Sequence, residues 1–134
     1  MTSGSGAARG DVLLLVGTRK GCFILSSNNS RRTWALAGPY CAGSEVFHFV
    51  YDPRDGGRAL AAVNQMVWGQ EIQFTNDLGG TWSSGKEQPR FSGDTSQKID
   101  RLWHIEPGRE NEPGILYVGV QPAALFKSDD DGDT

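Results

Sequence analysis

The sequence contains no long apolar segment, only two cysteines and no surplus of basic residues. No apolar run approaches the roughly 18 residues that a membrane-spanning helix needs. The apolar segment 12–17 is also too short for the core of a signal peptide and lacks a small-residue cleavage site. We therefore expect a cytoplasmic location and no membrane partner.

The charge pattern argues against a nucleic-acid partner. The 13 basic and 16 acidic residues are interspersed and leave a formal net charge of −3, whereas nucleic-acid-binding domains usually carry a basic patch. Cys22 and Cys41 do not form a CxxC motif, so we expect free thiols. The longest stretch without glycine or proline, 22–37, contains an Asn/Ser/Arg patch, which excludes a long helical bundle or a coiled coil.

A motif of eight residues recurs along the chain. Its full form at 75–82 follows the pattern Ser/Thr-x-Asp-x-Gly-x-Thr-Trp. A degraded copy occupies 27–34, and a third copy begins at Ser128 and runs to the last residue, so its tryptophan would be the next residue. The motif positions are filled by Ser27, Asn29, Thr33 and Trp34, by Thr75, Asp77, Gly79, Thr81 and Trp82, and by Ser128, Asp130, Gly132 and Thr134.

Short apolar segments flank each motif in the same order, which indicates a repeating unit of about 50 residues. These segments are rich in β-branched and aromatic residues and are bounded by Gly, Pro, Asn and Asp, as strands are. Residues 96–106 also show a helix-like spacing, so a helix is an alternative there, but the match to 45–51 favours a strand. The expected strands lie near 12–17, 22–26, 33–37, 45–51, 58–64, 70–75, 81–84, 101–106, 115–120 and 124–128.

The motif has the chemistry of a tight turn between two strands. Its Asp can accept hydrogen bonds from backbone N–H groups of the turn, and its Gly can adopt a positive φ. Its Trp supplies a large apolar side chain for packing between sheets. The acidic run 129–133 does not have the ligand spacing of an EF-hand loop, so we expect neither a metal nor a cofactor.

The boxes at 75–82 and 128–134 resemble the Asp-box, or bacterial neuraminidase repeat (BNR), of β-propellers in the sialidase superfamily. Segments 14–21, 45–48 and 103–108 resemble the start of exo-α-sialidase-like, glycosyl-hydrolase-like repeat proteins. The resemblance implies an all-β fold, a β-propeller of four-stranded antiparallel blades. The blades would span 12–37, 45–84 and 101–134, after a disordered segment 1–11. Because propellers close with four to eight blades, these two and a half blades are expected to be an incomplete propeller.

In such a propeller the loops opposite the boxes would form the functional face. Its candidate ligand-binding residues are Arg19, Tyr40, Glu45, Trp68, Glu71 and Arg101. His48 and His104 recur at matching places in the innermost strands, either as ligand-binding groups or as hydrogen-bonded structural residues.

The resemblance implies an exo-α-sialidase-like activity, for which the family uses an arginine cluster, a Tyr–Glu pair and an Asp. The Arg-Ile-Pro motif of the first catalytic arginine is absent and no Tyr–Glu pair can be placed, so the catalytic residues are unknown. The leading hypothesis is a parent protein that binds, or also hydrolyses, a glycan or another small polar ligand. The alternatives are a non-catalytic scaffold with a protein partner and an inactive truncated product.

Overall fold

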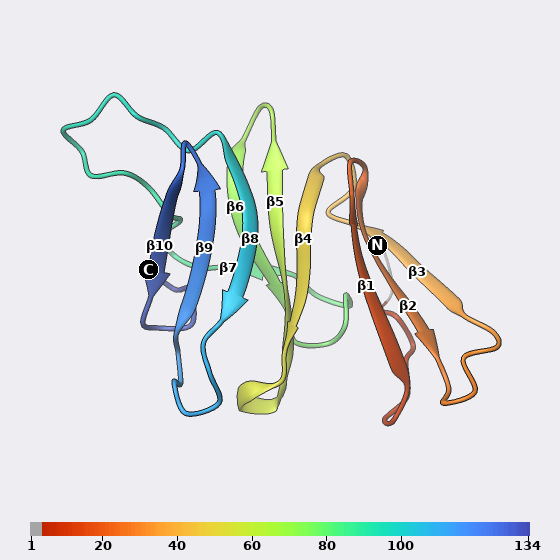
Figure 1. The fold of residues 1–134 in the computed structure, drawn as a ribbon. Coiled ribbons are helices and arrows are strands. Elements are labelled where there is room, and N and C mark those ends of the chain that lie inside the picture. The colour runs from red at the N-terminus through yellow and green to blue at the C-terminus, as the bar shows by residue number, and fades with distance from the viewer. Residues whose placement is uncertain (1–3) are drawn as a thin grey trace.

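The computed structural model describes residues 4–134 and has an all-β fold (Figure 1). A short 3-10 turn, η1 (Arg54–Gly56), follows β4. The strands are β1 (Val12–Thr18), β2 (Gly21–Ser27), β3 (Ala35–Tyr40), β4 (Glu45–Asp52), β5 (Arg58–Gln65), β6 (Gly69–Thr75), β7 (Ser83–Ser84), β8 (Arg101–Pro107), β9 (Leu116–Gln121) and β10 (Ala124–Ser128).

The strands form three antiparallel sheets in which chain neighbours pair. Sheet 1 has the order β1-β2-β3, sheet 2 the order β4-β5-β6-β7 and sheet 3 the order β8-β9-β10. The first strands of the sheets adjoin, because β4 contacts both β1 and β8. Each predicted strand position is occupied by a strand, although β3 begins two residues later than predicted and β7 is short.

The alternative of a helix at 96–106 is wrong, because Arg101–Pro107 forms β8. The helix-like spacing has a local cause. The register of β8 against β9 shifts between Leu102 and His104, so Leu102 and Ile105 are both buried although they lie three residues apart. A β-bulge adds one residue to one strand of a pair, and it therefore produces a period of three inside a strand.

Two hydrophobic clusters hold the sheets together face to face. The first joins sheets 1 and 2 and includes Ile24, Tyr40 and Val63, with Trp82 packed against it. The second joins sheets 2 and 3 and includes Leu60 and Leu102 among other buried side chains. Sheet 2 is therefore covered on both faces, which explains why residues 59–63 of its strand β5 are all apolar.

The second and third boxes have the same hydrogen-bonded structure. The backbone N–H of Thr81 donates to Asp77 Oδ1 at 2.8 Å, and its hydroxyl donates to Asp77 Oδ2 at 2.8 Å. The corresponding distances from Thr134 to Asp130 are 3.0 and 2.6 Å. The glycine of each box has a positive φ, 97° and 82° respectively. The predicted turn chemistry is confirmed in these two boxes.

The first box is built differently, as its departures from the motif suggest. Asn28, one residue before the expected Asn29, accepts hydrogen bonds from the backbone N–H and the hydroxyl of Ser30. Arg31 stands in place of the glycine and still has a positive φ of 53°. Without an Asp at the third position, this turn lacks the carboxylate that binds both groups of the closing threonine in the other boxes.

The box edge of sheet 2 also contacts the segment before β1. The backbone N–H of Ser5 donates to the carbonyl of Leu78 in the second box at 3.0 Å. Residues 1–3 of the segment predicted to be disordered lie outside the described residues, and residues 4–11 contain neither a strand nor a helix. Within residues 4–134, no helix has the length and hydrophobicity that crossing a membrane requires.

Candidate functional site

A groove of about 440 Å³ lies at the loop edge of sheets 1 and 2, opposite the boxes. The turns after β1, β3 and β5 form it, because the alternating strand directions bring these connections to one edge. We call it the loop-edge groove. Its lining residues are Arg19, Ala42, Gly43, Ser44, Glu45, Asn64, Gln65, Met66, Val67 and Trp68.

The hairpin between β5 and β6 supplies the apolar part of the groove. Gly69 has a positive φ of 91° at the start of β6 and closes this tight connection. The three residues before it are turned outward: Met66, Val67 and Trp68 are 103, 78 and 86% exposed. The Trp68 ring is therefore available to a ligand rather than packed beneath its neighbours.

Polar side chains from different strands form the rest of the groove. Arg19 Nε donates to Glu45 Oε1 at 3.1 Å, and Gln65 Nε2 donates to Ser44 Oγ at 2.7 Å. The Arg19 side chain is 88% exposed and that of Glu45 is 29% exposed. An ion pair this exposed contributes about 0–1 kcal/mol, so either partner can exchange it for a ligand at little cost.

The groove brings together three of the predicted site residues, Arg19, Glu45 and Trp68. Tyr40 lies elsewhere, fully buried and 5.7 Å from Trp82 between ring centroids. Glu71 accepts a hydrogen bond from Gln73 on the same strand. Arg101 Nη1 donates to the carbonyl of Asp100 at 2.7 Å, outside the groove lining.

The two histidines stack on each other across β4 and β8, with ring centroids 3.9 Å apart. The backbone N–H of Ile105 donates to His48 Nδ1 at 3.1 Å, and His104 Nε2 lies 3.1 Å from Glu106 Oε2. Burial and the neighbouring His104 lower the pKa of His48. The hydrogen bond from Ile105 to His48 joins β8 to β4, which supports the structural alternative for His48.

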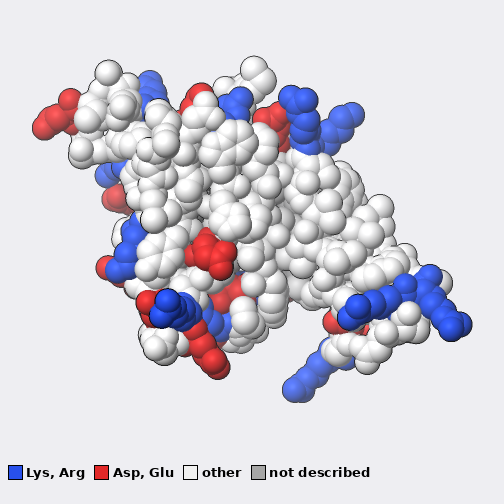
Figure 2. Space-filling model, viewed as in Figure 1, with Lys and Arg blue, Asp and Glu red and all other residues white. Residues whose placement is uncertain are grey.

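An aromatic pair lies beside the histidines on the same strands. Phe47 and Trp103 are partly exposed and their ring centroids are 4.6 Å apart. Figure 2 shows that the centre of the face viewed in Figure 1 carries few charges, while Lys, Arg, Asp and Glu gather toward its edges.

The sequence reasoning missed seven of the ten groove residues, among them Ser44, Gln65, Met66 and Val67. A usable signal was present for two of them. Met66-Val67-Trp68 is an apolar run at a position where a strand-to-strand turn is expected, and such turns are normally polar. Ser44 and Gln65 carry no comparable signal, because their contact depends on the relative placement of sheets 1 and 2.

Among residues 4–134, no group of three or more His, Cys, Asp and Glu side chains is arranged to hold a metal ion. The fold and the groove define an all-β protein of three antiparallel sheets with an aromatic and polar site at one edge. No protein-family model matches the sequence, and no curated protein matches it either.

Proposed function

We propose that the three sheets are blades of a sialidase-like β-propeller and that the loop-edge groove binds a glycan or a similar small polar ligand. The observation that carries the proposal is the exposed Trp68 ring beside Arg19, Glu45 and Gln65. Two further features support the blade arrangement: the Asp-box geometry of two turns and the adjoining first strands of the sheets.

The groove offers the two kinds of contact that a sugar needs. A sugar ring has an apolar face of C–H groups that can lie on an indole, and a rim of hydroxyls that need donors and acceptors. Arg19 and Gln65 provide donors, and Glu45 provides acceptors. An anionic sugar would also pair with Arg19, whose planar guanidinium suits a carboxylate.

The groove favours binding over hydrolysis by these residues. Sialidase-like hydrolysis uses a Tyr–Glu pair and an Asp, and the lining of the groove contains Glu45 but neither a tyrosine nor an aspartate. We therefore propose a ligand-binding role for this face, and any hydrolytic role would need groups outside the groove.

The test is titration of the protein with sialosides and neutral oligosaccharides, followed by calorimetry. We expect Trp68→Ala to weaken binding at least about tenfold, equivalent to about 1.4 kcal/mol, and Trp68→Phe to retain part of the affinity. Trp103→Ala is the matched control, because this exposed tryptophan lies outside the groove. Absence of binding across the panel, or equal losses in the two alanine variants, would refute the proposal. Fluorogenic sialosides test hydrolysis separately.

The exposed run Met66-Val67-Trp68 favours a second candidate, a scaffold that docks a protein partner. Adjacent exposed apolar side chains often mark such surfaces. The variant Met66→Ser/Val67→Thr separates the candidates, because it removes apolar area but leaves the Trp68 ring. Loss of a captured protein with sugar binding intact would support the scaffold, and loss of neither would count against it.

A further inference from the structure

Two cysteines lie together where β2 begins and β3 ends. Cys22 is fully buried and lies directly opposite Tyr40 in the strand register, and Cys41 is the next residue along the chain. Beyond this pair the two segments stay together, because the backbone N–H of Gly43 donates to the carbonyl of Lys20 at 3.3 Å. Both cysteines are free thiols. Backbone contacts on either side therefore hold Cys41 next to Cys22.

The backbone of Cys41 turns its side chain towards Cys22. Side chains of a regular strand alternate between faces, so Cys41 would point away from the face that Tyr40 and Cys22 share. Cys41 instead has a positive φ of 50°, which a residue with a side chain rarely adopts. It packs against the hydrophobic cluster that contains Cys22, and the two thiols are hydrogen-bond partners. The left-handed backbone thus brings the two sulfur atoms together.

The strand spacing suits a disulfide bond between them. Opposite Cα atoms of an antiparallel pair lie about 4.5–5.5 Å apart, and a strand advances about 3.4 Å per residue. The residue next to an opposite one is therefore roughly 6 Å away, within the range of about 4.4–6.8 Å that disulfides span. A bridge between Cys22 and Cys41 should need little backbone movement.

The two thiols differ in accessibility and in acidity. Cys41 is partly exposed, whereas Cys22 is completely buried. The hydrogen bond from Cys22 lowers the pKa of the Cys41 thiol against the opposing effects of burial and of Glu71, while the same contact and burial raise the pKa of Cys22. Cys41 Sγ also donates to Gln73 Oε1 of β6 at 3.2 Å. Because the thiolate is the nucleophile, Cys41 is the sulfur that reacts first.

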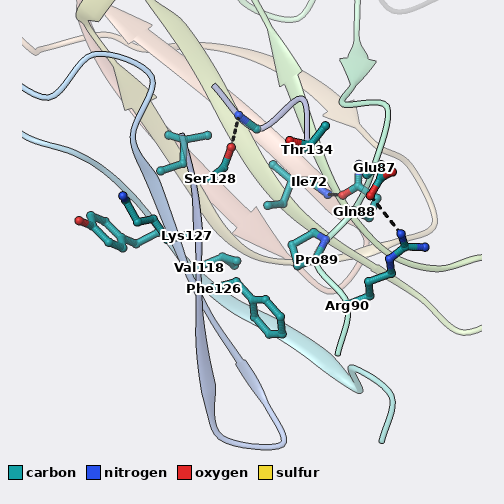
Figure 3. A pocket seen from close by; sticks show the side chains of 13 residues that line it. Ile72, Glu87, Gln88, Pro89, Arg90, Val118, Phe126, Lys127, Ser128 and Thr134 are labelled. Atoms are coloured by element: carbon teal, nitrogen blue, oxygen red, sulfur yellow. Dashed lines mark hydrogen bonds and ion pairs between the residues drawn. The ribbon is translucent and has the colours of Figure 1, made fainter. Parts of the chain in front are cut away.

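The fold alone does not account for this pair. Counted from the threonine of each box, the place of Cys41 is taken by Pro89 in the next repeat. Figure 3 shows the chain beside Pro89 attached to β6 through a side-chain amide, since Gln88 Oε1 accepts from the backbone N–H of Ile72 at 2.8 Å. The second repeat thus reaches its neighbouring strand without a thiol at this position.

We propose that Cys41 is an oxidation site, at which a hydroperoxide produces a reversible disulfide bond between Cys41 and Cys22. The Cys41 thiolate first attacks the peroxide: an S–O bond forms, the O–O bond breaks, and hydroxide or alkoxide leaves and takes a proton from water. The sulfur of Cys22 then attacks that of Cys41: an S–S bond forms, the S–O bond breaks, and the oxygen leaves as water with the proton of Cys22. The two thiols supply the two electrons that reduce the peroxide.

The bridge would stiffen the turn that follows β3. The backbone N–H of Ser44 donates to the carbonyl of Cys41 at 3.1 Å, and Ser44 belongs to the wall of the loop-edge groove. A disulfide between residues 22 and 41 would also restrict the unfolded chain. This inference does not depend on which ligand the groove binds.

The first experiment treats the reduced, folded protein with hydrogen peroxide and maps its cysteines. Trypsin separates them at Arg31 and Arg32. We expect both thiols to disappear and a crosslinked peptide pair to form that is about 2 Da lighter than the sum of the reduced peptides and is restored by dithiothreitol. Unchanged thiols, a sulfinic acid at Cys41 or a disulfide between two molecules would overturn the proposal.

Cysteine variants separate the two steps of the reaction. In Cys22→Ala the oxidation should stop at a sulfenic acid on Cys41, which dimedone captures. In Cys41→Ala the buried Cys22 should keep its thiol under the same treatment. The second variant replaces a partly exposed residue and keeps the proposal testable if the first does not fold. Loss of the Cys22 thiol in Cys41→Ala would overturn the assignment of Cys41 as the first sulfur to react.

A third variant tests the contact between Cys41 and β6. Gln73→Glu places a carboxylate beside Cys41 and should slow formation of the bridge at least about tenfold, because a neighbouring negative charge disfavours the thiolate. Gln121→Glu makes the same change on sheet 3 and should leave the rate unchanged. Equal rates in the two variants would mean that the Cys41 thiolate does not make the attack.

The melting temperature shows whether the native backbone accommodates the bridge. The oxidised protein should melt about 5 °C or more above the reduced protein, and the amide proton of Ser44 should exchange with deuterium more slowly. A bridge that lowers the melting temperature would form only by distorting the fold and would overturn the proposal.

Discussion

The hydroxyl of Thr75 holds the second box together from inside the sheet. It accepts a hydrogen bond from Gly79 N at 2.8 Å and donates to Asp77 Oδ1 at 2.8 Å, and the residue is 1% exposed. The Asp77 carboxylate in turn binds the backbone and hydroxyl of Thr81. One buried hydroxyl thus connects β6 to the whole turn.

We expect Thr75→Val to destabilise the protein by about 1–3 kcal/mol, because valine keeps the shape but leaves the buried Gly79 N–H without its acceptor. Thr75→Ser keeps the hydroxyl and should lose less stability than Thr75→Val. Urea unfolding at neutral pH measures both. A smaller loss of stability in Thr75→Val than in Thr75→Ser would show that the methyl group, not the hydrogen bonds, matters here.

His48 should make folding stability depend on pH near neutrality. Burial and the adjacent His104 lower its pKa in the folded state, so the unfolded chain binds the proton more readily. Its contribution to stability is complete above pH of about 6.5, the usual histidine value, and is lost as pH falls through the lowered folded pKa. His48→Asn retains an acceptor for Ile105 N and should flatten this slope in thermal unfolding between pH 7 and 5. An unchanged slope would assign it to other groups.

At the scale of strands, the contact between β1 and β4 depends on glycine, which has no side chain, at position 17. A Cβ at Gly17 would lie 2.3 Å from the carbonyl oxygen of Val46. Asn64 makes the corresponding contact of β5 with β8, since its side-chain amide exchanges two hydrogen bonds with the backbone of Leu102, at 3.1 and 2.8 Å. At the same position of the repeat, β1 approaches β4 through a glycine, whereas β5 contacts β8 through the hydrogen bonds of an asparagine side chain.

Gly17→Ala should therefore destabilise the protein by about 1–3 kcal/mol, because the methyl group forces β1 and β4 apart. Gly119→Ala is the matched control on β9, where an added Cβ meets no atom within 4 Å, and should be neutral or slightly stabilising. Denaturant unfolding of both variants measures the difference. Similar losses would mean that flexibility, not the close approach, explains Gly17.

The sequence predicts the strands well because each is short, apolar and bounded by turn residues. The ends of a strand depend on its pairing as well as on its residue types. β3 extends to Tyr40 because Cys22 pairs with Tyr40 across a register shift. The alternative helix at 96–106 arose from the bulge in β8, which no single-sequence pattern distinguishes from a helical period.

The candidate site was only partly predictable for a related reason. Trp68 and Arg19 could be assigned to the loop edge by counting strand reversals. Tyr40 follows the same count, but its ring turns inward to meet Trp82. Side-chain direction at a strand end depends on packing between sheets, which the residue pattern alone does not contain.

At the scale of the whole molecule, a buried ion pair joins sheet 2 to the loop between β8 and β9. Arg54 binds both oxygens of Asp52 at 2.9 Å and donates to the carbonyls of Glu112 and Ile115. The Asp52 side chain is only 2% exposed. Burial alone would raise the pKa of Asp52, but hydrogen bonds and charge from Arg54 lower it overall.

Removing the buried Arg54 cation should destabilise the protein much more than removing an exposed cation. We expect Arg54→Met to destabilise the protein by about 3 kcal/mol, since it leaves a buried carboxylate with one backbone N–H of residue 54 and the longer contact to Arg58. Arg90→Met breaks an exposed pair with Glu87 and should change stability by less than about 1 kcal/mol. Guanidinium unfolding compares them, and a similar effect of both would contradict the bridging role.

Acid should unfold the protein mainly through its box and bridge carboxylates. The pKa values of Asp52 and Asp77 are lowered, and the hydrogen bonds from Thr134 and Ser128 lower that of Asp130 to about 2. Because these folded-state values lie below the unfolded ones, their contribution is complete above pH of about 4 and is lost as pH falls toward 2. We expect the stability of Asp130→Asn to fall less steeply with pH across this range than that of the unsubstituted protein, and circular dichroism measures the difference.

The two hydrophobic clusters share sheet 2 but have no residue in common. Such a molecule behaves as a short one-dimensional array, in which each unit is stabilised only by its neighbours. The outer sheets have one neighbour and the middle sheet has two, so fraying should begin at the ends. Amide protons of β5 should then exchange with deuterium only through global opening, whereas those of β3 and β10 should exchange through cheaper local openings.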